Sequence, residues 1–335
     1  MPSDVFPEKE KVEEVIKYFR GHNIQLLARM NFSFVDSVCR KVENKKTNRG
    51  RKKEYKYSQN FQAVIYGLVN GANSIRGISR VIDTNLVKFI ISKEKTQSYS
   101  TIDRFWNFLS KVIEKIFEAL VKIMTNYGMI GNEYAIDGTS IEVPQIDPGG
   151  KWNYDATKEE YYYGYGLAIV VDVETELPIS AKFTRQKKLN KSVMEEIITK
   201  AVKIKKPIEL LGDSEFDVIS IIKNLIEQKV LPVIKYNPRN SKENLSIKYR
   251  AEKIVSEMTD SVTLNRKELD KVYRTKRPAV ERSNGILKTL GLECPPIQGK
   301  KHVKTWVYFV LIERILIAIS KYEENPEANL RRITI

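Results

Sequence analysis

Hydrophobic residues recur at helical spacing through the first third of the chain. Apolar positions three and four apart between residues 12 and 30 predict helices near the start of the sequence. Two shorter helices are predicted within residues 60–82, separated by the turn Asn-Gly-Ala-Asn, and Ser74 is placed to cap the second one. This arrangement is typical of a helix-turn-helix, although ordinary helical hairpins share it. A longer helix is predicted from about residue 100 to Met124.

The pattern changes after residue 130, where short apolar runs predict strands. Residues 238–275 are polar and lysine-rich with no clear period, Pro278 marks the start of a helix to about Leu290, and a final apolar helix is predicted over 303–322. Three strands followed by alternating helices and strands predict a mixed α/β sheet. The predicted strands are 134–137, 164–173, 177–183, 208–212 and 230–235, and the helices between them are 194–204 and 218–226.

The charge balance narrows the class of partner. The chain of 335 residues has 57 Lys and Arg against 42 Asp and Glu, a formal net charge of +15. Such an excess favours a polyanionic partner, but charge alone does not separate nucleic acid from an anionic membrane surface. The basic stretch 40–56 is suited to an exposed linker or to an arm that touches phosphates, and equally to a solvated loop.

Few residues are available for soft metal ligation or for disulfides. The two cysteines, Cys39 and Cys294, are far apart in the sequence, so a disulfide framework is excluded and a reducing compartment is favoured. His22 and His302 are the only histidines, which argues against a His-rich zinc site or a His-based triad. Any metal ion is therefore expected to be held by oxygen, as magnesium and manganese prefer.

No segment of the sequence predicts secretion or a membrane span. The first residues lack the basic and apolar regions of a secretory signal. The most apolar stretch, residues 306–319, is short and is interrupted by Glu313 and Arg314, so it predicts a core helix. The expected localisation is cytoplasmic, in association with the nucleoid.

Three acidic residues stand out by their local sequence. Asp137 ends the run Glu-Tyr-Ala-Ile-Asp, and Asp213 ends the run Ile-Glu-Leu-Leu-Gly-Asp. Glu281 lies in Arg-Pro-Ala-Val-Glu-Arg-Ser-Asn-Gly-Ile-Leu-Lys, in the first turn of the helix that Pro278 begins. Each has an ordinary structural explanation, because an Asp that closes a strand is commonly a turn or cap residue and a Glu near a helix start suits the helix dipole.

Together the three acids suggest a metal site. Two carboxylates at strand ends and a third on a later helix can converge on a pair of divalent ions, and such a pair cleaves phosphodiesters. If the first and fourth predicted strands are neighbours, Asp137 and Asp213 lie side by side, and Glu281 completes the cluster. In a basic chain, the phosphodiester is expected in nucleic acid.

The segments around these acids resemble the three active-site regions of DDE transposases of bacterial and archaeal insertion sequences. The resemblance covers roughly residues 130–320, where the order of elements resembles an RNase H-like catalytic domain. The family signature around the third acid is Tyr-x2-Arg-x3-Glu-x6-Lys, and Arg277, Glu281 and Lys288 match its spacing. Tyr273 lies one residue too far upstream and Arg274 occupies its place, which leaves the role of Tyr273 open.

The resemblance implies an α/β fold with an RNase H-like mixed sheet flanked by helices, preceded by an all-α DNA-binding region. The implied division is a helical DNA-binding region at 1–130, a catalytic domain at 131–322 and a tail at 323–335. The implied activity is cut-and-paste DNA transposition with two Mg²⁺ or Mn²⁺ ions, held by the three acids. The implied partners are terminal inverted repeats, target DNA and a second copy of the chain in a synaptic complex.

Basic and aromatic residues near the acids are candidates for DNA contact, with solvated surface charges as the default explanation. Lys288 lies two helical turns after Glu281, on roughly the same helix face. Trp152, beside several tyrosines, either stacks on an unpaired base or packs in the core or a loop, whereas Trp306 is expected in the core. The expected DNA contacts are Arg277, Lys288, Arg274, Lys187, Lys188 and Arg185.

Two alternatives to a transposase are considered. A structure-specific nuclease on the same scaffold would cleave DNA without strand transfer, and a sequence-reading N-terminal region argues against it. A transposase-derived DNA-binding regulator would have lost catalysis, and intact acids at all three positions argue against that.

Overall fold

The computed structural model describes residues 32–43, 54–155, 159–240, 246–258 and 265–333. They divide into two compact units, one formed by the described residues up to Leu120 with Pro296–Ala328, the other by Val121–Pro295 with Asn329–Arg331. The helices predicted between residues 12 and 30 lie outside the described residues, as does most of the basic stretch 40–56. The start of that stretch, residues 40–43, belongs to a helix rather than to an irregular linker.

The first unit is helical, as predicted, and contains the expected helix pair. Ser74 caps the second helix of the pair, since its Oγ accepts a hydrogen bond from the Gly77 N–H at 2.9 Å. Gly71 takes a φ of 83° in the turn between the two helices, a conformation that glycine adopts without steric cost. The helices are α3 (Ser33–Glu43), α4 (Tyr57–Val69), α5 (Ile75–Val81), α6 (Asn85–Ile90), α7 (Tyr99–Asn126, in this unit up to Leu120) and α13 (Lys300–Glu324).

Helix α13 forms the core of this unit. Its Phe309 ring stacks on Phe61 of α4 with 5.1 Å between ring centroids, and Trp306 is buried. Even Glu313 and Arg314 are buried, so the prediction of a core helix is confirmed. In the described part of the chain, no helix is long and apolar enough to cross a membrane.

The second unit is built on a mixed, six-stranded sheet whose order is β2-β3-β1-β5-β6, with β4 also paired to β3. Strands β2, β3, β1 and β4 pair antiparallel, whereas β5 and β6 continue parallel to β1. Without the short β2, this is the RNase H-like arrangement that the sequence predicted. The strands are β1 (Glu133–Glu142), β2 (Lys151–Asp155), β3 (Glu160–Asp172), β4 (Pro178–Thr184), β5 (Glu209–Gly212) and β6 (Leu231–Ile234).

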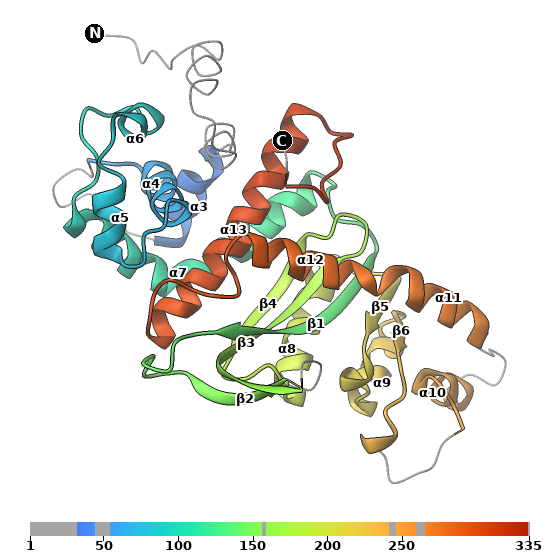
Figure 1. The fold of residues 1–335 in the computed structure, drawn as a ribbon. Coiled ribbons are helices and arrows are strands. Elements are labelled where there is room, and N and C mark those ends of the chain that lie inside the picture. Colours follow the sequence, from blue (N-terminus) through green and yellow to red (C-terminus); the bar gives the residue numbers. More distant parts are fainter. Residues whose placement is uncertain (1–31, 44–53, 156–158, 241–245, 259–264, 334–335) are drawn as a thin grey trace. The chain divides into compact units, whose positions relative to one another are not determined.

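Helices cover both faces of this sheet (Figure 1). On β3, Ala168 pairs with Lys182, whose ammonium contacts Glu196 of α8 at 2.9 Å, so α8 covers the face of these residues. Helix α12 crosses the other face, where it contacts β1 and β3. The helices are α8 (Lys191–Ile204), α9 (Ile219–Glu227), α10 (Arg250–Met258), α11 (Arg266–Lys276) and α12 (Pro278–Thr289), with short 3-10 turns η1 (Ser214–Phe216) and η2 (Pro238–Asn240).

Three features of this unit differ from the sequence prediction. The strand expected to end at Asp137 continues to Glu142, because Gly138 to Glu142 pair with β3. Strand β2 is absent from the prediction, since it is only five residues long and pairs with β3 alone. The stretch 238–275 contains α10 and α11, short helices whose few buried apolar residues (Ala251, Ile254, Val255 and Leu269) stand among charged ones.

Candidate active site

Parallel pairing of β1 with β5 places Asp137 beside Asp213. The paired residues run from Glu133 opposite Glu209 to Ala135 opposite Leu211. Asp137 and Asp213 each lie two residues beyond the last of these pairs, so both side chains point to the same face of the sheet. The condition under which Asp137 and Asp213 were expected to lie side by side, that the first and fourth expected strands are neighbours, is therefore met.

Asp137 is held by two residues of the helix segment that crosses this face. Its Oδ1 accepts a hydrogen bond from Arg277 Nη2 at 3.1 Å, and its Oδ2 accepts one from Asn284 Nδ2 at 3.0 Å. The Arg277 side chain is 7% exposed and that of Asp137 is 18% exposed, so this is a largely buried ion pair. Burial raises the pKa of Asp137, Arg277 acts in the opposite direction, and the neighbouring Asp213 raises the pKa again.

Asn284 is a residue of this site that sequence reasoning missed. Its amide donates to Asp137, and the residue is buried. Its Oδ1 is also buried and has no hydrogen-bond partner among the described residues, and the same is true of Arg277 Nε. The signal in the sequence was its position three residues after Glu281, which places both on neighbouring sides of one helix.

Tyr273, Arg277 and Glu281 form one stripe because α11 runs almost directly into α12. Arg277, between the two helices, has the helical angles φ −55° and ψ −36°, and its N–H donates to the Tyr273 carbonyl at 3.0 Å. Residues spaced by four in a helix share a face. Arg277 Nη1 lies 3.5 Å from Glu281 Oε1, so the guanidinium bridges Glu281 and Asp137. The displaced tyrosine is thus one helical turn before Arg277.

The phenol of Tyr273 lies within electrostatic reach of all three acids. Burial raises its pKa, Arg277 lowers it, and the charges of Asp213, Glu281 and Asp137 each raise it. One side chain therefore senses all three carboxylates. The ammonium of Lys235, at the end of β6, lies 4.2 Å from the centre of the Tyr273 ring.

Asp213 also has the structural role that its sequence context suggested. Its Oδ1 accepts a hydrogen bond from the Glu215 N–H at 2.9 Å and so caps η1. Glu215 is a fourth acid in this region, and its Oε1 accepts a hydrogen bond from the Leu189 N–H at 3.2 Å. Burial raises the pKa of Glu215, and the charge of Asp213 acts in the same direction. A capping role and a place at the site are therefore compatible for Asp213.

The donors in this region suit a hard divalent cation. Carboxylate oxygens are the ligands that magnesium and manganese prefer, and the buried Asn284 Oδ1 is a further oxygen without a partner among the described residues. Across the described ranges, no three His, Cys, Asp or Glu side chains are already drawn together closely enough to hold a metal ion. Instead Arg277 supplies positive charge between Asp137 and Glu281.

The predicted DNA contacts fall into three groups. Arg185, Lys188 and Arg274 are exposed. Two other candidates form ion pairs: Lys187 Nζ lies 2.8 Å from Oδ1 of the buried Asp155, and Lys288 Nζ lies 2.8 Å from Oε1 of the partly exposed Glu293. The remaining candidate, Arg277, is buried against Asp137.

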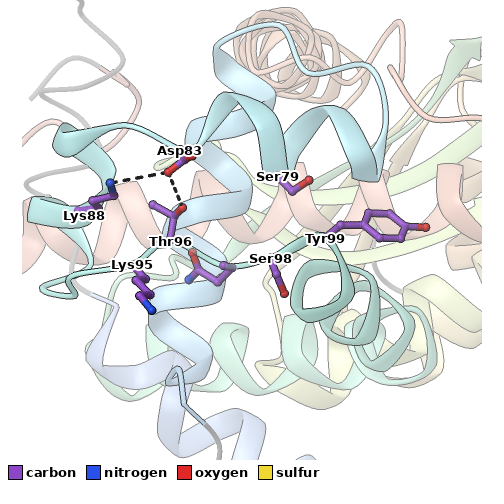
Figure 2. Close-up of a pocket in the computed structure, with 8 residues that line it drawn as sticks. Ser79, Asp83, Lys88, Lys95, Thr96, Ser98 and Tyr99 are labelled. Atoms are coloured by element: carbon purple, nitrogen blue, oxygen red, sulfur yellow. Dashed lines mark hydrogen bonds and ion pairs between the residues drawn. The ribbon is translucent and has the colours of Figure 1, made fainter.

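A separate pocket lies among the helices of the first unit (Figure 2). Its volume is about 310 Å³, and Asp83 lies between Lys88 and Thr96 on its wall. Asp83 is the one carboxylate among its lining residues, which are otherwise hydroxyl, amide, lysine and tyrosine side chains. A single acid is not sufficient for a two-metal site, so the carboxylates of the second unit remain the candidate centre.

Comparisons with known proteins agree with this assignment. The chain is 29% identical over 286 residues to the probable transposase for insertion sequence element ISH11 of Halobacterium salinarum, in strain R1 and in strain NRC-1, over 85% of this chain and 86% of the relative. A piggyBac transposase synaptic complex with hairpin DNA has a TM-score of 0.47 at 12% identity, covering 94% of this chain and 79% of that one. The Mos1 strand transfer complex has a TM-score of 0.23 at 11% identity, covering 74% and 82%. Structural likenesses this distant carry no conclusion about this chain.

The family match covers the unit that contains the three acids. Residues 131–315, more than half of the chain, match the family described as Transposase DDE domain, whose members generally use divalent metals. The matched range begins just before β1 and includes β5 and α12, the elements that position Asp137, Asp213 and Glu281. The chain therefore belongs to the DDE transposase family of insertion sequences and is a DNA transposase.

Proposed function

We propose that Asp137, Asp213 and Glu281 are the catalytic triad of this transposase and that they hold two Mg²⁺ or Mn²⁺ ions. The observation that carries the proposal is the Arg277 guanidinium, which lies 3.1 Å from Asp137 and 3.5 Å from Glu281. The parallel register of β1 and β5 supports the proposal further, because it places Asp213 beside Asp137. When bound, two such ions activate the attacking oxygen and stabilise the leaving oxygen of an in-line displacement.

The residues around the acids prepare them for this role. Arg277 favours the ionised form of Asp137, because the guanidinium opposes the effect of burial on the carboxyl pKa. Asn284 fixes the orientation of the same carboxylate through its second oxygen. Glu281, with a side chain that is 67% exposed, is free to turn toward Asp137 and Asp213. With metal ions bound to these acids, the site would cleave DNA ends and join them to a target.

Basic residues on the surface are proposed to bind the phosphate backbone. The exposed Arg185, Lys188 and Arg274 are directly accessible to DNA. Lys288 is in a partly exposed ion pair with Glu293, which contributes little to stability and can exchange its carboxylate for a phosphate. Lys187 pairs with the buried Asp155 and is proposed to reach DNA while it stays in that pair. Arg277 acts at the catalytic acids rather than on the outer backbone.

The helical region at 1–130 is proposed to recognise the terminal inverted repeats, with α4 and α5 as the sequence-reading helix pair. The catalytic domain is proposed to span 131–322, and the chain is proposed to act as a homodimer that pairs two DNA ends. The turn between α4 and α5 and the Ser74 cap support the assignment of these helices to sequence reading. The two ends of one element require two active sites in one complex, which supports the proposed homodimer.

The test is cleavage and strand transfer on a labelled element end with magnesium, using wild type and Asp213→Ala. We expect metal-dependent cleavage by wild type and none by the variant. The matched control is Glu195→Gln, an exposed acid on α8 across the sheet, which should cleave as wild type does. Cleavage that survives in Asp213→Ala would refute the triad, whereas end binding by wild type without cleavage would establish a regulator. Cleavage without strand transfer would establish a nuclease.

A further inference from the structure

The hairpin formed by β2 and β3 exposes a row of aromatic side chains. We define the aromatic ladder as Trp152 and Tyr154 on β2 with Tyr161 and Tyr163 on β3. Trp152 is 58%, Tyr154 52% and Tyr161 70% exposed. Trp152 is paired across the strands with Tyr163, and Tyr154 with Tyr161, with ring centroids 5.6 and 5.1 Å apart. Trp152 therefore belongs to a surface rather than to the core.

The base of the ladder is held in place. Tyr163 donates its hydroxyl hydrogen to the Asp147 carbonyl at 2.9 Å. Gly150 packs so closely on the Tyr163 ring that an added Cβ would lie 2.4 Å from Cε1. Large aromatic side chains exposed together on a fixed scaffold mark a binding surface more often than a packing accident.

The strand register places the ladder on the same face of the sheet as Asp137. Asp137 pairs with Ile169 on β3, and directly paired residues point to one face. Steps of two along β3 lead from Ile169 to Tyr163 and Tyr161, which keeps that face. Trp152 and Tyr154 on β2 pair with Tyr163 and Tyr161, so their side chains point to the same face. A DNA strand at Asp137 that continued along this face would pass over the four rings.

The hairpin has basic residues on both of its faces. Lys151 on β2 and Lys187, whose ammonium binds Asp155 and whose backbone N–H donates to the Tyr162 hydroxyl at 3.1 Å, belong to the face opposite the ladder. The exposed Arg185 comes two residues after Phe183, which pairs with Leu167, so strand alternation places Arg185 on the face of the ladder. Flat rings together with a cation on one face are a combination that binds single-stranded nucleic acid, because the rings stack on bases and the cation neutralises a phosphate.

We propose that the aromatic ladder stacks the bases of unpaired DNA adjoining the strand held at the catalytic acids. The position of that strand rests on the proposed function, whereas the preference of the ladder for unpaired bases does not. In a duplex the bases are stacked on one another, so their faces are covered. Stacking on these rings therefore requires bases that are already unstacked. The other possible occupant of an exposed aromatic face, a second copy of this chain, is distinguished by the experiment.

Tryptophan fluorescence tests the proposal without any catalytic step. Of the three tryptophans, Trp106 and Trp306 are buried, so Trp152 is the one exposed to a bound base. We expect an oligothymidylate to quench the fluorescence of the full chain more strongly than a duplex of the same length. In an anisotropy assay with labelled oligothymidylate, Tyr161→Ala and Trp152→Ala should each weaken binding at least about fivefold, and Trp152→Phe should retain it. Ile208→Ala, another exposed apolar residue on the same sheet, should bind as wild type does.

Equal affinities of Tyr161→Ala and wild type for the oligothymidylate would overturn the proposal. So would a change in sedimentation without a change in DNA affinity, since that result assigns the face to a second copy of the chain. Tyr161 is mostly exposed, so its replacement leaves the fold intact, and a thermal melt verifies this. Asp213→Ala separates the two proposals: quenching retained by this variant supports the ladder, and cleavage retained by it refutes the triad alone.

Discussion

The second and the first unit each bury a carboxylate, and the two are buried in different ways. Asp137 on β1 has a guanidinium on one oxygen and an amide on the other. Glu313 lies within the buried length of α13, where burial raises its pKa to about 8 and is the one cause acting on it among the described residues. The partners of the first favour its charged form, whereas burial favours the neutral form of the second.

The contrast teaches how a buried acid can be judged. An ionised carboxylate that is removed from water raises the free energy of the folded state unless it forms an ion pair and hydrogen bonds. Such partners around a buried carboxylate therefore indicate that its charged form is retained. A buried acid whose pKa rises toward neutrality has given up its charge and serves as a polar packing group. By this criterion Asp137 fits the proposed metal site, and Glu313 fits a packing role.

The largest effect is expected at Asp137. Replacing it with Ala removes a proposed metal ligand, and metal ions supply several kcal/mol of transition-state stabilisation. Because each factor of ten in rate corresponds to about 1.4 kcal/mol, DNA cleavage should fall by roughly 1,000-fold or more. Glu313→Gln in the same assay should keep wild-type activity. Equal losses in the two variants would erase the distinction between the two acids.

The second effect is the pH dependence of stability that Glu313 produces. Its pKa is about 8 in the folded chain and 4.5 as the ordinary value, so the unfolded chain releases this proton at lower pH. Stability contributed by the protonated group is therefore lost as pH rises from about 4.5 to 8, and the loss levels off above that range. Denaturant unfolding should show a decline of a few kcal/mol across this window in wild type and a much flatter profile in Glu313→Gln. Parallel profiles would contradict the assignment.

The third effect concerns the counter-charge of the buried acid. Asp137 has the Arg277 guanidinium beside it, and Glu313 has no such cation among the described residues. Arg277→Met leaves Asp137 buried without its counter-charge, which typically costs about 3 kcal/mol or more of stability. Adding Asp137→Asn should recover part of this loss, because no anion is then left uncompensated. Chemical unfolding of the four proteins of this double-mutant cycle measures the coupling. The exposed Arg274→Met serves as a control, and additive effects in the cycle would mean that the pair is not coupled.

The smallest effect is expected at Asn284. Its amide donates one hydrogen bond to the charged Asp137, so Asn284→Ala should cost about 1–3 kcal/mol of stability and lower cleavage several-fold through misorientation of the carboxylate. Gly285→Ala, one residue later, is the matched control, since nothing described lies within 4 Å of an added Cβ there. Thermal melts and cleavage rates of the two variants make the comparison. An unaffected Asn284→Ala would mean that Arg277 alone holds Asp137.

Local sequence patterns predicted the elements on which the acids lie. Asp213 directly follows β5, and Pro278 begins α12 with Glu281 in its first turn, as expected. These features depend on neighbours within a few residues, which a single sequence displays. The misplaced tyrosine was harder to interpret because α11 was not predicted. Once α11 is known to run into α12, Tyr273 lies on the same stripe as Arg277 and Glu281.

Contacts between distant segments were beyond the reach of such patterns. Arg277 has the family spacing before Glu281, yet it also binds Asp137, 140 positions away in the sequence, at 3.1 Å. Strand β2 forms only because β3 offers a partner, and that pairing brings Trp152 to the surface. Side-chain orientation on a strand depends on which neighbour it pairs with and in what register, and register is a property of the sheet rather than of either strand.

The sequence by itself determined which acids are available, the helical spacing of Arg277, Glu281 and Lys288, and the excess of positive charge. Only the tertiary structure decided that Asp137 and Asp213 share one face, that Asn284 reaches Asp137, and that the aromatic ladder continues that face. The physical reason is distance along the chain. Helix periodicity relates residues three or four apart. Sheet register relates Ala135 to Leu211, and helix-on-sheet packing relates Asp137 to Asn284, 147 positions away, and those relations exist only after folding.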